Sequence, residues 1–339
     1  MAGRIDRYQQ GHPWLGVPIA VVYKFFDDQA GYLAALLTYY GFVSLFPLLL
    51  LAVTVLGFLL QGNAHLQHQV LNSALSQFPI VGKQVQTNVH QYKGSGTGLI
   101  FGILGSLYGG LGVMQAGQNA FNHIWGIPRN NRPNPIKSRA RSLVLLAGLG
   151  TGALLSTSLT GLATDSSSYV PALHVSGLFR VGAIVVGVVL NSVVFVAAFR
   201  SMTARDVTIR EVLPGALTTA VLWQLVQSGG TYYLAHKLHA SQEVYGVFGL
   251  VLGMLAWIYL LAVVVMLGAE VNAVLHRHLW PRALLTPFTD NVDLTEADQS
   301  AYESYAHIQR FKGFEKIDAT FDERASEDRP DLMAGPTVE

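Results

Sequence analysis

The sequence predicts an all-α, polytopic membrane protein with six transmembrane helices. Three observations predict it: long apolar runs, a low charged fraction and a one-sided distribution of Lys and Arg. Of the 339 residues, 51% are hydrophobic and only 13% are charged, whereas a soluble domain carries about 25% charged residues. The chain has no cysteine, which excludes disulfides, thiolate metal sites and a cysteine nucleophile.

The apolar runs have the length of membrane spans. A helix needs about 20 mostly apolar residues to cross a bilayer core. Six stretches meet this requirement: Gly31–Leu60, Thr97–Met114, Ser142–Ala163, Leu178–Phe199, Val212–Ala235 and Gly246–Leu275. They are continuously apolar rather than alternating, which favours helices that satisfy their own backbone hydrogen bonds over the strands of a barrel.

The segments between the spans differ sharply in charge. Those expected on one side hold 18 Lys and Arg residues, and those on the other side hold three, namely Lys83, Lys93 and Lys237. Cytoplasmic segments carry the excess of positive charge. We therefore expect a bacterial plasma (inner) membrane protein with both its N-terminus and its C-terminus in the cytoplasm.

The chain divides into three predicted regions. Residues 1–30 form a cytoplasmic segment with an amphipathic interfacial helix over 17–28, and residues 31–280 form the membrane domain. Residues 281–339 are expected to be a largely disordered cytoplasmic tail, since 290–339 hold 13 acidic and five basic residues. Between spans one and two, helical spacing on both sides of Pro79 predicts extracytoplasmic amphipathic helices in 61–96.

Span two is rich in glycine, with Gly98 and Gly102, and Gly105 and Gly109, each four residues apart. Such spacing permits close helix approach. We favour packing within one bundle over a dimer interface. Pro47, near the middle of span one, is expected to kink that helix.

Two stripes of uncharged polar residues interrupt the apolar helices. Span five carries Gln224, Gln227 and Ser228, and the inner end of span two carries Gln115, Gln118, Asn119 and Asn122. Amides facing hydrocarbon without a partner cost several kcal/mol each, so these side chains must face protein or water. The stripes are explained either by a hydrated path for a polar head group or by interhelical hydrogen bonds.

Glu270, followed by Asn272, lies in the last turns of span six. An ionisable residue in a membrane segment is a functional-site hypothesis by default. We favour a structural ion pair that locks the inner helix ends over a proton or substrate site. The expected partners are Arg200, Arg205, Arg139 or Arg141.

The sequence predicts no metal site and no cofactor. Of its 11 histidines, six form three closely spaced pairs (His65 and His68, His236 and His239, His276 and His278), none with a well-spaced third ligand. The basic segment 129–141 is explained by topology and by anionic lipid, so no nucleic acid partner is expected.

Several short segments, taken in order, match one family. They are Leu37-Thr38-Tyr39-Tyr40 and Ser44-Leu45-Phe46-Pro47, Asn119-Ala120-Phe121-Asn122-His123-Ile124-Trp125, Leu213-Pro214-Gly215-Ala216, Tyr245-Gly246-Val247-Phe248-Gly249, Trp257-Ile258-Tyr259, and Leu267-Gly268-Ala269-Glu270-Val271-Asn272. Over about residues 20–280 the chain resembles the YihY/BrkB family of bacterial inner-membrane proteins, once labelled ribonuclease BN. The resemblance implies a six-helix membrane protein that is suspected of transporting lipid-like envelope material and has no established catalytic residue.

Two functions follow as hypotheses. The first is transport or flipping of an amphipathic envelope lipid, with Gln224, Gln227, Ser228, Tyr40, Gln115 and Asn119 along the path and Glu270, Asn272 and Pro47 as a structural lock or gate. The alternative is a non-catalytic scaffold that binds an envelope protein or a second copy of the chain. No enzyme is expected. Ribonuclease activity in particular is not expected, because metal-assisted phosphodiester cleavage needs a dense His/Asp cluster.

Overall fold

The structure, a computed structural model, describes residues 6, 8–59, 96–148, 177–237, 242–289 and 292–321. Within these residues every regular element is helical. Residues 135–148 are also helical. The helices with full bounds are α2 (Pro13–Asp27), α3 (Ala30–Leu59), α6 (Gly96–Ile124), the short 3₁₀ helix η1 (Arg129–Asn131), α8 (Gly177–Met202), α9 (Ile209–Lys237), α10 (Gln242–His276) and α11 (Glu296–Ile308).

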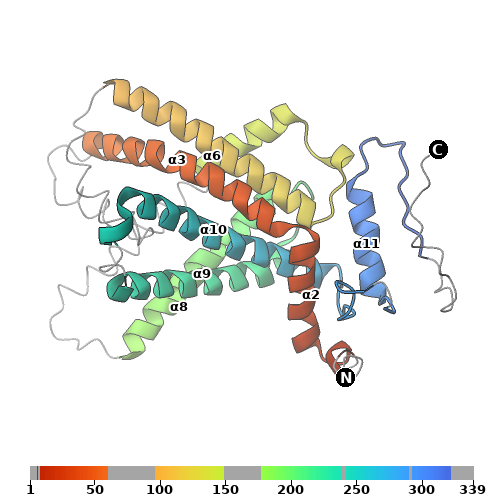
Figure 1. Cartoon of the computed structure of the whole chain (residues 1–339). Coiled ribbons are helices and arrows are strands. Elements are labelled where there is room, and N and C mark those ends of the chain that lie inside the picture. Colours follow the sequence, from red (N-terminus) through yellow and green to blue (C-terminus); the bar gives the residue numbers. More distant parts are fainter. Residues whose placement is uncertain are drawn as a thin grey trace.

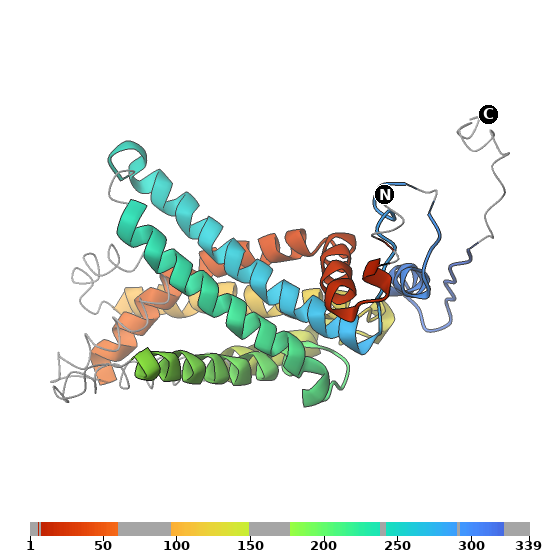
Figure 2. The same ribbon diagram turned by 90° about the horizontal axis from the view of Figure 1, so that it is seen from below.

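The long helices form a bundle, and the two short helices α2 and α11 lie at one end of it (Figure 1). Helix α3 packs mainly on α6, while α9 packs on both α8 and α10. The view from below shows α11 lying beyond the same bundle end as α2 (Figure 2). Segments that are far apart in sequence therefore meet at this end.

The predicted spans are helical wherever they are described. Among the described residues, Val185–Met202 and Val251–His276 are long and apolar enough to cross a membrane. Most of the third predicted span and nearly all of the segment 61–96, with its predicted helices, lie outside what the structure describes. The number of spans and the topology stay predictions.

Glycines bring α3 and α6 into close contact. A Cβ atom built on Gly105 would lie 2.6 Å from Pro47 Cγ, and one on Gly109 would lie 2.4 Å from Ser44 Cβ. One turn further, Gly112 leaves room for the ring of Tyr40. The predicted packing within one bundle is thus confirmed for Gly105 and Gly109.

Helices α9 and α10 cross at a second pair of glycines. A Cβ atom on Gly215 would lie 2.0 Å from the carbonyl oxygen of Gly268, and one on Gly268 would lie 1.8 Å from Thr219 Oγ1. Neither glycine thus has room for a side chain, because backbone and the Thr219 side chain fill the space. Further along α9, Gly230 faces the ring of Trp257, which would lie 2.1 Å from an added Cβ.

The cationic segments meet at the end of the bundle where α2 and α11 lie. We call it the basic end: Lys24, residues 129–141, residues 200–210, Arg277 and Arg282. One hydrogen bond joins residues 129–141 to residues 200–210: Arg141 Nη2 donates to the Thr203 carbonyl at 2.8 Å. A second joins residues 200–210 to the end of α6: Ala204 N–H donates to Asn122 Oδ1 at 2.7 Å. The segments that the charge distribution assigns to one membrane face are therefore together in space.

Helix α2 begins at Pro13, earlier than the predicted 17–28. Its Ala20 and Val21 are buried in a cluster with Val274 of α10 and Ala301 of α11. Trp14 and Phe26 are 65% and 72% exposed. One face is thus packed on the protein while large apolar side chains remain free, as an interfacial helix requires.

The expectation of a largely disordered tail from residue 281 onward is wrong for its first part. Helix α11 begins with a capping box, in which Thr295 Oγ1 accepts from Asp298 N–H and the Asp298 carboxylate accepts from Thr295 N–H. Its Ala301 and Ile308 are buried. The acidic composition of this region predicts a solvated segment, but the carboxylate of Asp298 is buried against Arg282. Residues 322–339 lie outside the described residues.

Candidate functional site

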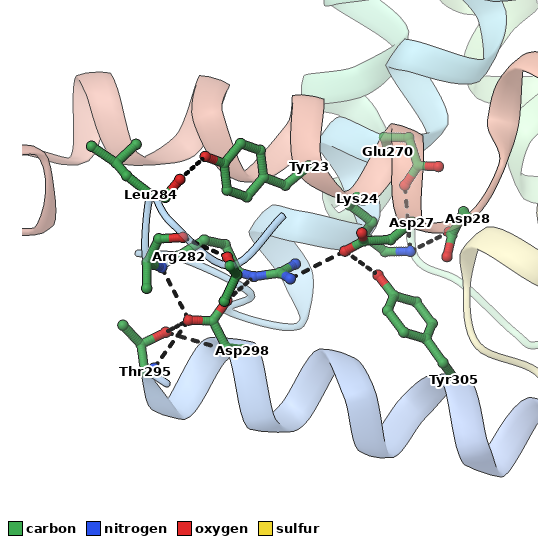
Figure 3. Close-up of polar contacts among 12 residues, drawn as sticks. Tyr23, Lys24, Asp27, Asp28, Glu270, Arg282, Leu284, Thr295, Asp298 and Tyr305 are labelled. Carbon is green, nitrogen blue, oxygen red and sulfur yellow. Dashed lines mark hydrogen bonds and ion pairs between the residues drawn. The ribbon is translucent and has the colours of Figure 1, made fainter. Parts of the chain in front are cut away.

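Three charged residues are buried together at the basic end, where α2 meets α10. Lys24 lies on the buried face of α2, one turn before Asp28, and Glu270 comes from α10. Lys24 Nζ forms an ion pair with Asp28 Oδ2 and lies 3.4 Å from Glu270 Oε2 (Figure 3). All three residues are at most 2% exposed. We call them the Lys24 cluster.

Burying these charges is costly, so their pairing decides whether the arrangement is stable. An ion taken out of water costs several kcal/mol even after relaxation, and only good partners repay it. The ammonium group of Lys24 pairs with two carboxylates, those of Asp28 and Glu270. Its contact with Glu270 is an ion pair rather than a short hydrogen bond. The guanidinium of Arg277 adds positive charge nearby; burial lowers its pKa, and attraction to Asp28 opposes that effect. The cluster ties α2 to α10.

A second buried group, the Arg282 cluster, joins α2 to α11. The Arg282 guanidinium pairs with Asp298 through Nε and with Asp27 Oδ2 through Nη2 at 3.1 Å (Figure 3). Asp298 Oδ2 also accepts from Ala283 N–H at 3.0 Å. Tyr305 of α11 donates to Asp27 Oδ2 at 3.2 Å.

The electrostatics of the Arg282 cluster keep its groups in defined protonation states. Burial opposes the charge of Arg282, but the hydrogen bond and charge of Asp298 and the charge of Asp27 outweigh it and raise the guanidinium pKa. Burial raises the pKa of the Tyr305 phenol, and the carboxylates of Asp28 and Asp27 raise it further. Arg282 is therefore a fixed cation and Tyr305 a fixed hydrogen-bond donor.

The structure pairs Glu270 with a cation, but the expected partners were wrong. Its ion-pair partner is Lys24, not Arg200, Arg205, Arg139 or Arg141. Lys24 belongs to the helix that the sequence predicts on the inner membrane interface, and its pairing with Glu270 depends on how that helix packs against α10. The second predicted lock residue, Asn272, accepts a hydrogen bond from Gly215 N–H at 2.7 Å and so joins α10 to α9. The third, Pro47, packs against Gly105.

The polar stripe at the end of α6 is used for packing. Gln118 Nε2 donates to Ser142 Oγ at 2.8 Å, Asn122 binds the Ala204 amide, and the exposed Asn119 accepts from Arg132 Nη1 at 2.8 Å. Gln115 is partly buried on the same helix. These contacts favour the interhelical hydrogen-bond interpretation for this stripe.

The stripe on α9 has a different setting. Gln224 and Gln227 are partly buried and Ser228 is exposed. Four residues before Gln227, Trp223 packs against Phe195 of α8, with ring centroids 5.6 Å apart. Residues three or four apart share a helix face, so the stripe borders the contact with α8. Tyr40 lies elsewhere, in the contact between α3 and α6.

Sequence reasoning missed Lys24, Arg282, Asp27 and Asp298. Local signals exist for two of them: Lys24 stands four residues before Asp28 on a helix, and Asp298 has the spacing of a capping box with Thr295. Neither signal identifies the distant partner. The pairings of Lys24 with Glu270 and of Arg282 with Asp27 span most of the chain and depend on its tertiary fold.

The long helices form a bundle, and some of them are apolar and long enough to cross a membrane. The Lys24 cluster and the Arg282 cluster, which we together call the charged junction, lie at one end of it. This arrangement is that of an integral membrane protein. The family model for virulence factor BrkB matches residues 21–287. The chain belongs to this family, and it is a membrane protein. The matched range contains Lys24, Glu270 and Arg282 but ends before α11.

Relatives carry similar descriptions. The chain is 28% identical over 273 residues to a UPF0761 membrane protein of Alkalilimnicola ehrlichii, covering 78% of this chain but only 60% of that relative. A UPF0761 membrane protein of Photobacterium profundum is 24% identical, with 84% and 89% of the two chains covered. The ribonuclease-like protein YfkH of Bacillus subtilis is 25% identical, with 72% and 89% covered. No solved structure matches the chain.

Proposed function

We propose that the protein transports or flips an amphipathic envelope lipid along a polar track on α9. The observation that carries the proposal is the setting of Gln224, Gln227 and Ser228. The two carboxamides are partly buried in a helix whose neighbours Val221 and Leu225 are exposed, and the Ser228 hydroxyl is exposed beside them. This places polar atoms at the edge of an otherwise apolar surface.

Such a track suits a lipid for a physical reason. Moving a head group through hydrocarbon is slow because its polar atoms lose their hydrogen bonds to water. Amide and hydroxyl groups open to one side can replace those bonds while the acyl chains stay in the bilayer. The track carries no fixed charge, so the proposal includes no proton coupling.

The charged junction supports the proposal as a lock on the helix ends. The Lys24 cluster holds α2 against α10, and Asn272 holds α10 against α9, the helix that carries the track. In this proposal Glu270 and Asn272 set the position of α9 relative to its neighbours. No catalytic residue and no nucleic acid partner are assigned.

The test uses the purified chain in liposomes that contain a fluorescent phospholipid. A membrane-impermeant quencher reports how fast the lipid reaches the outer leaflet. The double substitution Gln224→Leu and Gln227→Leu removes the polar track, and we expect lipid movement to fall at least about tenfold, the effect of raising the barrier by about 1.4 kcal/mol.

The matched control is Gln309→Leu, which makes the same change at the exposed C-terminus of α11. It should move lipid as fast as the unaltered chain. If the double variant is folded and equally fast, the track is not the path. That result would favour the scaffold alternative, for which Phe311 and Phe314, 55% and 89% exposed next to α11, offer a surface for a partner protein.

A further inference from the structure

A pocket of about 320 Å³ lies at the basic end, beside the end of α8. Its wall includes three arginines, Arg141, Arg200 and Arg205, and one carboxylate, Asp206. Arg141 comes from the helix over 135–148, Arg200 from α8, and the other two from the segment that joins α8 to α9. Arginines from three chain segments thus line one cavity.

The three arginines are held differently. Arg141 Nη2 is fixed by the Thr203 carbonyl at 2.8 Å. Arg205 Nη2 lies 3.1 Å from His276 Nε2 and 3.8 Å from Glu211 Oε1, so its charge is partly compensated. Within the described parts of the chain, the exposed side chain of Arg200 forms no hydrogen bond or ion pair. The pocket wall therefore holds three arginines against the single carboxylate of Asp206, an excess of positive charge.

An apolar strip leads along α8 to this pocket. Val186, Val189 and Val193 are 58%, 53% and 63% exposed. Steps of three and four residues continue from them to Ala197 and Arg200 on the pocket wall, which places all five on one helix face. The strip runs along Val185–Met202, one of the stretches apolar enough to cross a membrane.

We propose that the pocket binds the phosphate-bearing head group of an anionic phospholipid, with its acyl chains along Val189 and Val193. Guanidinium groups bind phosphate oxygens through paired, charge-assisted hydrogen bonds. Basic pockets between membrane helices on the cytoplasmic side are suited to anionic head groups. A free phosphate would use the arginines but would gain nothing from the valine strip, so the strip favours a lipid.

This site does not rest on the transport proposal, because a head group can bind at the pocket without crossing the membrane. The binding test uses the full chain in detergent, titrated with phosphatidylglycerol and, separately, with phosphatidylcholine. Native mass spectrometry counts the bound lipids. We expect phosphatidylglycerol to bind more tightly, and Arg200→Gln to weaken its binding about tenfold, the loss of one charge-assisted contact.

Two variants sharpen the comparison. Arg139→Gln makes the same change of charge at an exposed position that does not line the pocket, and should leave phosphatidylglycerol binding within about twofold, as expected for a screened surface charge. Val193→Asn should weaken phosphatidylglycerol binding while Arg200 remains intact. Arg200 has no structural contact to lose, so Arg200→Gln should melt at the same temperature as Arg139→Gln.

Four results would each overturn the proposal. Equal weakening by Arg139→Gln would mean diffuse charge, and equal binding of phosphatidylcholine would mean that the head group is not recognised. Displacement of the lipid by excess inorganic phosphate would identify a phosphate site instead. Unchanged binding by Val193→Asn would remove the acyl chains from α8.

Discussion

Asp27 and Asp28, adjacent at the end of α2, link the two buried clusters. Asp28 pairs with Lys24, while Asp27 pairs with Arg282. Carboxylates at a helix C-terminus are unfavourable, because the helix dipole places negative charge there. Both are compensated by cations, one from the same helix and one from the segment before α11. Asp27 thus joins α2 directly to Arg282, whereas Asp28 acts through Lys24, which in turn contacts Glu270 of α10.

The first prediction concerns Lys24. Replacement by Met leaves Asp28 and Glu270 buried without their cation, which should lower stability by about 3–5 kcal/mol. The measurement is the loss of helical circular dichroism on heating in detergent. Because the penalty comes from uncompensated charge, adding Asp28→Asn and Glu270→Gln to Lys24→Met should restore most of the stability.

Lys137→Met is the control for this prediction, since Lys137 is exposed in the helix over 135–148. It should melt like the unaltered chain. If Lys24→Met also melts like the unaltered chain, or if the triple variant melts no higher than the single one, the Lys24 cluster does not lock α2 to α10.

At the scale of elements, glycines on α9 allow α10 to pack closely against it. Gly215 meets the backbone of α10, and Gly230 meets the ring of Trp257. The adjacent Gly229 has nothing within 4 Å of an added Cβ. The two neighbouring glycines therefore face different environments on the same helix.

The second prediction uses this difference. Gly230→Ala should destabilise the bundle by about 1–3 kcal/mol, because a methyl group would overpack the buried Trp257 ring. Gly229→Ala should be neutral or stabilising by up to about 1 kcal/mol, since Ala favours helix more than Gly. Thermal unfolding of the two variants side by side makes the comparison. Equal effects would contradict the close α9–α10 packing.

Helix α11 supplies Asp298, a partner of the buried Arg282, so the C-terminal region is part of the junction between α2 and α11. Removing residues 290–339 would delete Asp298 and leave Arg282 buried with Asp27 alone. Such a truncation would therefore disturb the junction as well as remove any surface for a partner. Substitutions of exposed residues such as Phe314 separate the two effects, because Phe314 is 89% exposed.

At the scale of the whole molecule, the sequence predicts the helical class and the location of most helices. It does so because the apolar runs are long and their composition is uniform. The glycine packing of span two follows from local spacing and could be predicted for the same reason. These features depend on neighbours within one or two helical turns.

The charged junction could not be predicted in the same way. Lys24 and Glu270 are brought together only when α2 folds back on the end of α10, and the order of α11 depends on Arg282. Composition indicates a solvated acidic tail, whereas Asp298 is completely buried. The net charge of a segment does not show whether any one of its carboxylates is buried, and the burial of Asp298 is what holds α11 in place.

The central claim is that the basic end faces the cytoplasm while the bundle crosses the membrane. The chain has no cysteine, so single cysteines can be introduced without background. Gln309→Cys lies at the basic end and Lys237→Cys at the last residue of α9. Intact cells and inside-out vesicles are treated with a membrane-impermeant maleimide. The account predicts that Cys at 309 reacts only in the vesicles and Cys at 237 only in the cells; reaction of both from the same side would contradict it.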